Sequence, residues 1–331
     1  MRKRKIIFDV DTGSDDALAI VSALLCPEAF EVLGICTVAG NRPLPNTTDN
    51  TLRVLELLGR GDVPVIMGAE KPLVAKNDFT RVIRQVLETQ NEKGETIAYH
   101  AESLPIPPTT HTALENEHAA TWLIKTLMAA EEKITLVLTG PLTNFALAYR
   151  IAPEILDHVE EIVIMAGGDN QTNSTGAAEF NVFFDPEAAW ITFDAGLKVP
   201  LTMMTLDATH QAYLTPADAD RLRKMNNPLG QFCYDEITER LKAYNYLQPL
   251  GTPDIAPIHD ALCVMYLLDP TVITKKEFLH VDVVCGGIAN GLTLVDTRIW
   301  TPDPKNVNVC FATDTAKFRE MICSIFERSV H

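Results

Sequence analysis

The chain has 331 residues, of which 47% are hydrophobic, and this composition supports a large buried core and excludes a largely disordered protein. Its formal net charge of −16 argues against nucleic acid and against an anionic membrane as partners, and it leaves small neutral molecules and cations open. The seven cysteines are scattered singly and no apolar run has the length of a signal peptide or a transmembrane helix, so we expect a cytoplasmic protein without a disulfide framework.

The first predicted elements follow from the N-terminal pattern. An apolar run at 5–10 predicts a buried strand, and the helical spacing at 14–26 predicts a helix with Ser14 as its N-cap. The alternation then continues along the chain. It predicts strands at 30–40, 63–68, 134–140, 159–168 and 198–206, and helices at 46–59, 117–132, 144–153 and 185–196. This order indicates an α/β fold with a mostly parallel, Rossmann-like central sheet flanked by helices.

The last third of the chain has a different pattern. Residues 215–248 are predicted to be mostly helical, and another helix starts near 259. Three shorter apolar runs, at 278–287, 291–298 and 306–312, predict strands of a small antiparallel addition near the C-terminus. A helix predicted at 315–328 closes the chain. A polar stretch at about 71–112 interrupts the earlier alternation and predicts a long irregular insert of a length that is usually functional. Because no repeat or linker divides the sequence, we expect a single domain over residues 1–331.

Four aspartates crowd into eight positions at the end of the first predicted strand and directly after it. They are Asp9, Asp11, Asp15 and Asp16. Like charges this close raise each other's pKa and cost stability unless a positive charge lies between them. A solvated acidic turn would tolerate this crowding, whereas a bound cation would use it.

Polar side chains also follow the other predicted strands. In an open parallel sheet, ligands bind outside the carboxyl ends of the strands. The acids, amides and other polar residues expected at that edge are Asn41, Thr139, Asn144, Asn173, Glu179, Asn181, Asp207, His259 and Asp260. Each alone is compatible with a turn or a helix cap, but their repetition at strand ends indicates a ligand pocket. Asp11, Asp16 and Asp260 could supply carboxylates to calcium, whereas no histidine pair has the spacing of a zinc helix.

Five motifs in this order closely resemble the inosine-uridine-preferring nucleoside hydrolases. They are "DVDTGSDDALAI", "TVAGN", "LTGPLTN", "AEFNVFFDPEAA" and "IHDALC", and the resemblance covers nearly the whole chain. It implies a calcium-dependent enzyme of nucleoside salvage that hydrolyses the N-glycosidic bond of ribonucleosides to ribose and free base. It also implies a homodimer or homotetramer.

The resemblance further implies a role for each site residue. Calcium would be bound by the carboxylates of Asp11, Asp16 and Asp260 and by the main-chain carbonyl of Thr139. Asp11 would also be the general base that activates a water on the metal, and His259 would protonate the leaving base. Asp9 would have a supporting role. Ribose would be held by Asp15, Asn41, Met165, Asn173, Glu179 and Asn181, and candidates for contact with the base are His100, Tyr244 and Tyr246.

Two alternatives and one departure accompany this interpretation. A haloacid-dehalogenase-type Mg²⁺ phosphatase also begins with an apolar strand and "DxD", although Thr12 stands before Gly13 where that family reads DxDGT. A non-catalytic nucleoside- or calcium-binding protein would bind ribose without turnover. The family's "HGxxG"-type loop has its best match in "HAES", at 100–103, which lacks the glycines. The preference for purine or pyrimidine bases is therefore open.

Overall fold

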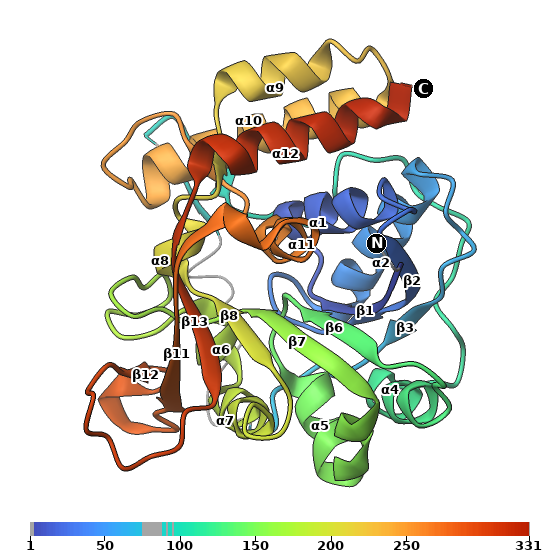
Figure 1. Ribbon diagram of the computed structural model, residues 1–331. Coiled ribbons are helices and arrows are strands. Elements are labelled where there is room, and N and C mark those ends of the chain that lie inside the picture. The colour runs from blue at the N-terminus through green and yellow to red at the C-terminus, as the bar shows by residue number, and fades with distance from the viewer. Residues whose placement is uncertain (1–2, 75–87, 91, 95, 331) are drawn as a thin grey trace.

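The computed structural model describes residues 3–74, 88–90, 92–94 and 96–330, and its centre is a nine-stranded sheet (Figure 1). The strands of this sheet are β1 (Arg4–Val10), β2 (Phe30–Thr37), β3 (Val65–Met67), β6 (Ile134–Leu138), β7 (Val159–Met165), β8 (Leu201–Met204), β11 (Ile273–Val283), β12 (Thr293–Asp296) and β13 (Val307–Thr313). Their spatial order is β12-β11-β13-β8-β7-β6-β1-β2-β3. The order places β1 among the inner strands and both β12 and β3 at the edges.

The sheet is parallel from β3 to β13. Strand β11 pairs antiparallel with both β13 and β12, which confirms the predicted antiparallel addition near the C-terminus. β13 joins the two parts of the sheet, because it pairs antiparallel with β11 on one edge and parallel with β8 on the other. β11 begins at Ile273, earlier than the apolar pattern predicts, since its first half is largely exposed and carries charged residues.

Successive side chains of β1 are buried in two separate hydrophobic cores, one on each face of the sheet. Ile6 and Phe8 point to one face, and Ile7 points to the other, as the two-residue period of a strand requires. All three are fully buried, which explains why this strand reads as a continuous apolar run without alternation.

Helices cover both faces of the sheet, as predicted (Figure 1). On one face lie α4 (Ala119–Met128), α5 (Thr143–Ile151) and α7 (Pro186–Ala195). On the other lie α1 (Ser14–Leu24) and α11 (Ala261–Leu268), with α9 (Pro216–Arg223), α10 (Pro228–Leu247) and α12 (Thr315–Glu327) packed beyond them. Among the described residues, the remaining α-helices are α2 (Leu44–Leu57), α6 (Phe180–Phe184) and α8 (Leu206–Thr209). Within the described ranges, no helix is both long and apolar enough to cross a membrane.

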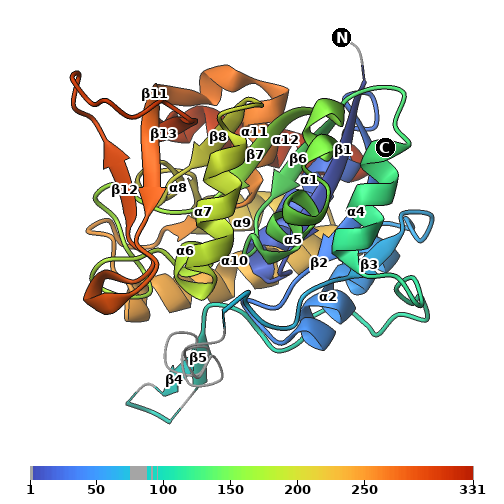
Figure 2. The same cartoon turned by 90° about the horizontal axis from the view of Figure 1, so that it is seen from below.

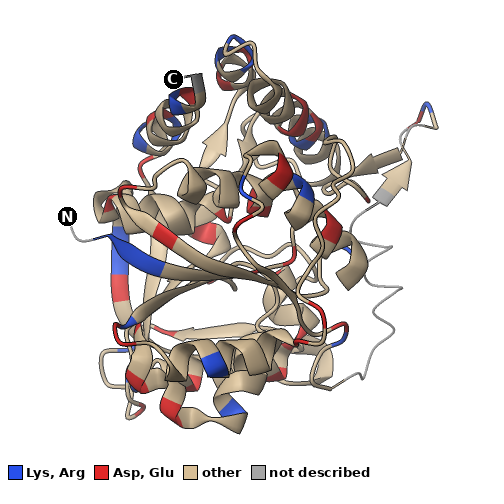
Figure 3. Cartoon of the chain, turned by 90° about the vertical axis from the view of Figure 1, so that its right-hand side faces the viewer, with Lys and Arg blue, Asp and Glu red and all other residues tan. Residues whose placement is uncertain are grey.

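Charged residues are distributed over the outer helices. Figure 3 shows acidic and basic residues interspersed on the side that it presents. The N-terminus of α1 is an exception to this outward distribution, because Asp15 and Asp16 in its first turn are buried. The N-cap is Gly13 instead of the predicted Ser14, so Ser14 is the first helical residue and the helix begins one residue earlier than that cap implies.

The insert at 71–112 is only partly irregular. Its described part contains a short antiparallel hairpin of β4 (Glu88–Gln90) and β5 (Thr96–Ala98), which projects from the body of the protein (Figure 2). After the hairpin the chain returns to the body, where Leu104 and Ile106 are buried in the same core as α1. The hairpin is thus followed by an anchored segment, and this segment brings residues 99 and 100 to the site described next.

Candidate active site

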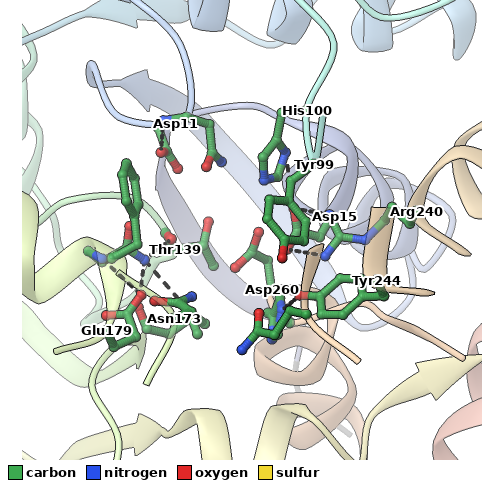
Figure 4. A pocket seen from close by; sticks show the side chains of 16 residues that line it. Asp11, Asp15, Tyr99, His100, Thr139, Asn173, Glu179, Arg240, Tyr244 and Asp260 are labelled. Carbon is green, nitrogen blue, oxygen red and sulfur yellow. Dashed lines mark hydrogen bonds and ion pairs between the residues drawn. The ribbon is translucent and has the colours of Figure 1, made fainter. Parts of the chain in front are cut away.

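A cavity lies beside the carboxyl ends of β1, β2, β6 and β7, where the sequence pattern predicted a pocket (Figure 4). The strand ends and the start of α1 supply its floor, the segment before α6 and α6 itself supply one side, and the insert, α10 and the start of α11 supply the other. The lining residues are Asp11, Asp15, Asn41, Tyr99, His100, Thr139, Met165, Asn173, Glu179, Phe180, Asn181, Arg240, Tyr244, Gln248, His259 and Asp260.

Two glycines allow the loops after β2 and β6 to close on Asp11. A Cβ atom on Gly40 would lie 2.1 Å from Oδ2 of Asp11, and one on Gly140 would lie 2.8 Å from its backbone nitrogen. Because neither position has room for a side chain, the backbone comes close enough for the N–H of Asn41 to donate to Oδ2 of Asp11 at 2.6 Å. This contact fixes the orientation of the Asp11 carboxylate.

Three buried carboxylates form a compact group. Asp15, Asp16 and Asp260 each offer an oxygen, and these oxygens lie within 4.8 Å of one another. Asp16 is held by the hydroxyl of Thr139, which donates to its Oδ1 at 2.7 Å. Asp11 lines the same cavity but does not belong to this compact group. The group therefore contains two of the three predicted carboxylate ligands, Asp16 and Asp260, together with Asp15.

The carboxylates of this site lack sufficient positive charge. Burial, followed by the charges of Asp16 and Asp15, raises the pKa of Asp11 well above its usual range. Burial and neighbouring aspartates likewise raise the pKa of Asp260, and they raise that of Asp16 to about 7. Only oxygen donors make up the compact group, which is the donor set that a hard divalent cation takes. The residues present therefore fit a metal ion of this class.

Arg240 supplies a positive charge that the sequence analysis missed. This arginine of α10 is 1% exposed, and its two terminal nitrogens donate to the two carboxylate oxygens of Asp15, each at 3.2 Å (Figure 4). It also donates to the hydroxyl of Ser14 at 2.7 Å and to the carbonyl of Pro257 at 2.9 Å. Burial is the largest influence on the pKa of Asp15 and raises it, but Arg240, together with His100 and His259, outweighs burial and lowers this pKa below its usual value, so Asp15 is held as a carboxylate.

A pair of residues before and within α6 completes the other side of the cavity. Glu179 is the N-cap of α6 and accepts hydrogen bonds from the backbone N–H groups of Gly167 and Asn181, at 2.9 and 2.8 Å. The amide of Asn181 donates to the carbonyls of Thr139 and Met165, at 2.8 and 3.0 Å. A carbonyl has two lone pairs, so that of Thr139 keeps one acceptor position for a ligand.

Aromatic and histidine side chains form the wall opposite Glu179. His259 lies between the hydroxyls of Tyr244 and Thr209, 2.5 Å from the first and 2.7 Å from the second. Tyr99 packs edge-on against Tyr244 with 5.3 Å between ring centres. His100 is buried 3.7 Å from Asp15, and burial is the main cause that lowers its pKa to about 4.

Three polar residues from the sequence analysis lie elsewhere. Tyr246 is 46% exposed, does not line the cavity and donates to the carbonyl of Gln90, so its predicted contact with the base is not supported. Asn144 holds Asp9 by donating to its Oδ1 at 2.8 Å, and it accepts from the backbone of residue 69. Asp207 accepts from the backbone N–H groups of the loop at 169–170. Asn144 and Asp207 therefore support loops instead of facing the cavity.

Comparison with known proteins gives one consistent family. The model of the family described as inosine-uridine preferring nucleoside hydrolase matches residues 6–320. The chain is 39% identical over 330 residues to the inosine-uridine preferring nucleoside hydrolase of Leishmania major, with 98% of each chain covered. It is 40% identical over 321 residues to the pyrimidine-specific ribonucleoside hydrolase RihB of Escherichia coli O1:K1 / APEC, with 96% of this chain and 95% of the relative covered.

Solved structures agree with these relatives. The purine-preferring ribonucleoside hydrolase from Gardnerella vaginalis matches with a TM-score of 0.85 and 30% identity, over 98% of each chain. The names of these three similar proteins give three different base preferences. Overall similarity therefore does not decide which base this chain prefers.

Proposed function

The chain belongs to the inosine-uridine preferring nucleoside hydrolase family and hydrolyses the N-glycosidic bond of ribonucleosides to ribose and free base; from this premise we propose that it does so with a bound calcium ion. The proposed ligands are the carboxylates of Asp11, Asp16 and Asp260 and the carbonyl of Thr139. Because the family model matches residues 6–320, the chain is a nucleoside hydrolase and not a haloacid-dehalogenase-type phosphatase. The homodimer or homotetramer that the resemblance implies stays a prediction.

One observation carries the calcium proposal. Asp11, Asp16 and Asp260 are buried, and each has a pKa that burial and neighbouring negative charges raise. The buried cation nearest to them, Arg240, is already engaged by both oxygens of Asp15. A divalent cation would compensate the remaining carboxylates and return them to the ionised form.

The proposed chemistry divides between the metal and the side chains. The metal site would supply positive charge beside the cavity, and this charge would favour the binding of ribose hydroxyls and lower the pKa of the attacking water. Asp11, fixed by the N–H of Asn41, would accept the proton of the water as general base. Asp15 and Glu179 would accept hydrogen bonds from ribose hydroxyls, and Asn41, Met165, Asn173 and Asn181 would complete the ribose site.

The carboxylates also suit the transition state. Cleavage of an N-glycosidic bond passes through a sugar with oxocarbenium character, so positive charge develops on the ring. Fixed negative groups in a buried site stabilise such charge without reorganising. Asp15 is buried, held by hydrogen bonds from Arg240 and kept ionised, so it meets this requirement. Burial raises the pKa of Glu179 to about 7, so Glu179 contributes in its ionised form.

A metal analysis tests the proposal directly. Protein prepared with calcium is expected to contain one calcium ion per chain by elemental analysis, and to release free ribose from a panel of purine and pyrimidine ribonucleosides. Chelation should abolish ribose release, and added calcium should restore it. Asp16→Asn should lower the calcium content, because it removes one negative charge from the compact group. Full activity in the metal-free protein, or zinc in place of calcium, would refute the proposal.

A second prediction concerns His259 and the leaving base. His259→Ala is expected to lower kcat on a natural ribonucleoside by about 10²-fold or more, the usual contribution of a group that protonates a leaving atom. On p-nitrophenyl riboside, whose leaving group needs no proton, kcat should change little. Steady-state kinetics on both substrates gives the comparison. An equal loss on the two substrates would show that His259 supports only the shape of the pocket.

A further inference from the structure

Thr209 hydrogen-bonds the side of His259 that faces away from the cavity. Its hydroxyl lies 2.7 Å from Nδ1 of His259, while Nε2 of the same ring lies 2.5 Å from the hydroxyl of Tyr244. Tyr244 and His259 line the cavity, but Thr209, at the end of α8, does not. Thr209 can therefore act on a bound nucleoside only through His259.

The hydroxyl hydrogen of Thr209 has one available acceptor, Nδ1 of His259, in the described part of the chain. The side chain is 0% exposed, and in the described part of the chain Nδ1 of His259 is its one hydrogen-bonding partner. If Nδ1 carried a hydrogen, that N–H would point at the threonine oxygen and the threonine hydrogen would be buried without an acceptor. A buried donor without an acceptor costs stability, so the favoured arrangement has Thr209 donating to a bare Nδ1.

We propose that Thr209 is a positioning residue that holds His259 in the tautomer with hydrogen on Nε2. Nε2 then donates to the oxygen of Tyr244, and the hydroxyl hydrogen of Tyr244 is left for the cavity. In the opposite tautomer the hydroxyl of Tyr244 would donate its hydrogen to Nε2, and its oxygen could only accept a hydrogen bond from a group in the cavity. The inference rests on the proposed function for its catalytic meaning, since the hydrogen is presented where the leaving base would lie.

The surroundings of Tyr244 favour its role as a hydrogen-bond donor toward the cavity. The guanidinium of Arg240 lies 5.5 Å from the centre of the Tyr244 ring. A positive charge over the ring withdraws electron density and makes the phenol a better hydrogen-bond donor. In the described part of the chain, the Tyr244 hydroxyl has no hydrogen-bonding partner other than Nε2 of His259, which is a donor in this tautomer. A heteroatom of the leaving base is therefore the acceptor that would complete the chain from Thr209 through His259 and Tyr244.

The first test reads the tautomer itself. In protein labelled with ¹⁵N-histidine, the nitrogen that carries hydrogen resonates well upfield of the bare nitrogen, and the His259→Asn variant identifies the signals of this ring. The unaltered protein should show hydrogen on Nε2, and Thr209→Val should shift the tautomer balance toward Nδ1. Hydrogen on Nδ1 in the unaltered protein would overturn the proposal, even if no variant folds.

The second test reads the consequence for the reaction. Thr209→Val is expected to lower kcat on uridine by about tenfold, the effect of one lost hydrogen bond, and to change kcat on p-nitrophenyl riboside by less than about twofold. Thr209→Ser, which keeps the hydroxyl, should restore kcat. Thr192→Val is the matched control, because Thr192 is equally buried and its hydroxyl donates only to the carbonyl of Ala188 in α7.

These outcomes separate the inference from the proposed function. If the unaltered protein releases no ribose from any ribonucleoside, the proposed function fails, while the ¹⁵N spectra still decide the tautomer. If Thr209→Val slows both substrates equally, or if serine does not restore kcat, Thr209 serves packing alone and the inference fails.

Discussion

Replacing Asp11 with asparagine is expected to lower kcat on a ribonucleoside by at least about 10²–10⁴-fold, while the protein still folds. The substitution removes the proposed general base and one negative charge from the proposed metal site. The fold should survive, because the one hydrogen bond to Oδ2, from the N–H of Asn41, can be accepted by the remaining amide oxygen. Steady-state kinetics, calcium content and thermal unfolding measure the three effects separately.

A second buried carboxylate provides the matched control. Asp185 is also fully buried, but it caps α7 by accepting from the N–H of Ala188 at 3.0 Å and accepts from the hydroxyl of Thr143 at 2.7 Å, away from the cavity. Asp185→Asn should lower the melting temperature and leave kcat within about threefold of the unaltered enzyme, because one acceptor is lost from a helix cap. Near-normal kcat in Asp11→Asn with full calcium occupancy would contradict the assignment of Asp11.

The enzyme is expected to prefer uridine over 2′-deoxyuridine by up to about 10⁴–10⁵-fold in kcat/KM. A site built to bind a hydroxyl rejects an analogue without it, because its buried polar groups are left unpaired. Asp15 is such a group, since Arg240 holds it ionised at the cavity wall, where it accepts from the 2′-hydroxyl in the proposed complex. Ribose and 2-deoxyribose release, measured over a range of concentrations, gives the ratio.

Intrinsic reactivity works against this preference, which sharpens the test. The 2′-hydroxyl withdraws electrons from the sugar ring and makes its glycosidic bond harder to break, so an indifferent site would cleave the deoxyribonucleoside at least as fast. Equal kcat/KM for the two substrates would therefore remove Asp15 from the ribose site. A loss that appears only in KM would show uniform binding without a contribution to the transition state.

Local patterns were sufficient to predict most of the fold. The parallel strands are short, buried on both faces and separated by helices, so apolar runs and helical spacing identify them without knowledge of their partners. Among the elements that escaped this approach, two have a clear physical reason. The hairpin of β4 and β5 has only three residues in each strand and no apolar alternation, and the first half of β11 is an exposed edge with charged residues.

The site was predictable where it depends on strand ends. Asp11, Asn41 and Thr139 follow β1, β2 and β6, and the geometry of a parallel sheet alone brings them to one edge. Arg240 was not predictable in the same way, because its partnership with Asp15 depends on how α10 packs against α1. A weak signal existed in the helical spacing, which places Glu236, Arg240 and Tyr244 on one face of α10.

The same helical spacing separates Tyr244 from Tyr246, the two tyrosines that are candidates for contact with the base. Residues two positions apart on a helix point about 200° apart, so Tyr244 and Tyr246 cannot both face one cavity. Tyr244 is buried at the cavity and Tyr246 is exposed. Tyr99 and Gln248, which also line the cavity, gave no signal, because an insert and a helix end carry them there.

The ion pair between Asp15 and Arg240 has a consequence for the order in which the protein is made. Ser14 and Arg240 are in contact although 226 residues separate them in the sequence. During synthesis the acidic turn after β1 emerges first, and the segments that carry Arg240 and Asp260 emerge only in the last third of the chain. Until then the turn lacks both its counter-charge and its remaining carboxylate partner, so repulsion among its aspartates keeps it solvated. The site is therefore completed only after the segment that carries Asp260 has been made, and a chain that ends before residue 240 lacks both Arg240 and Asp260.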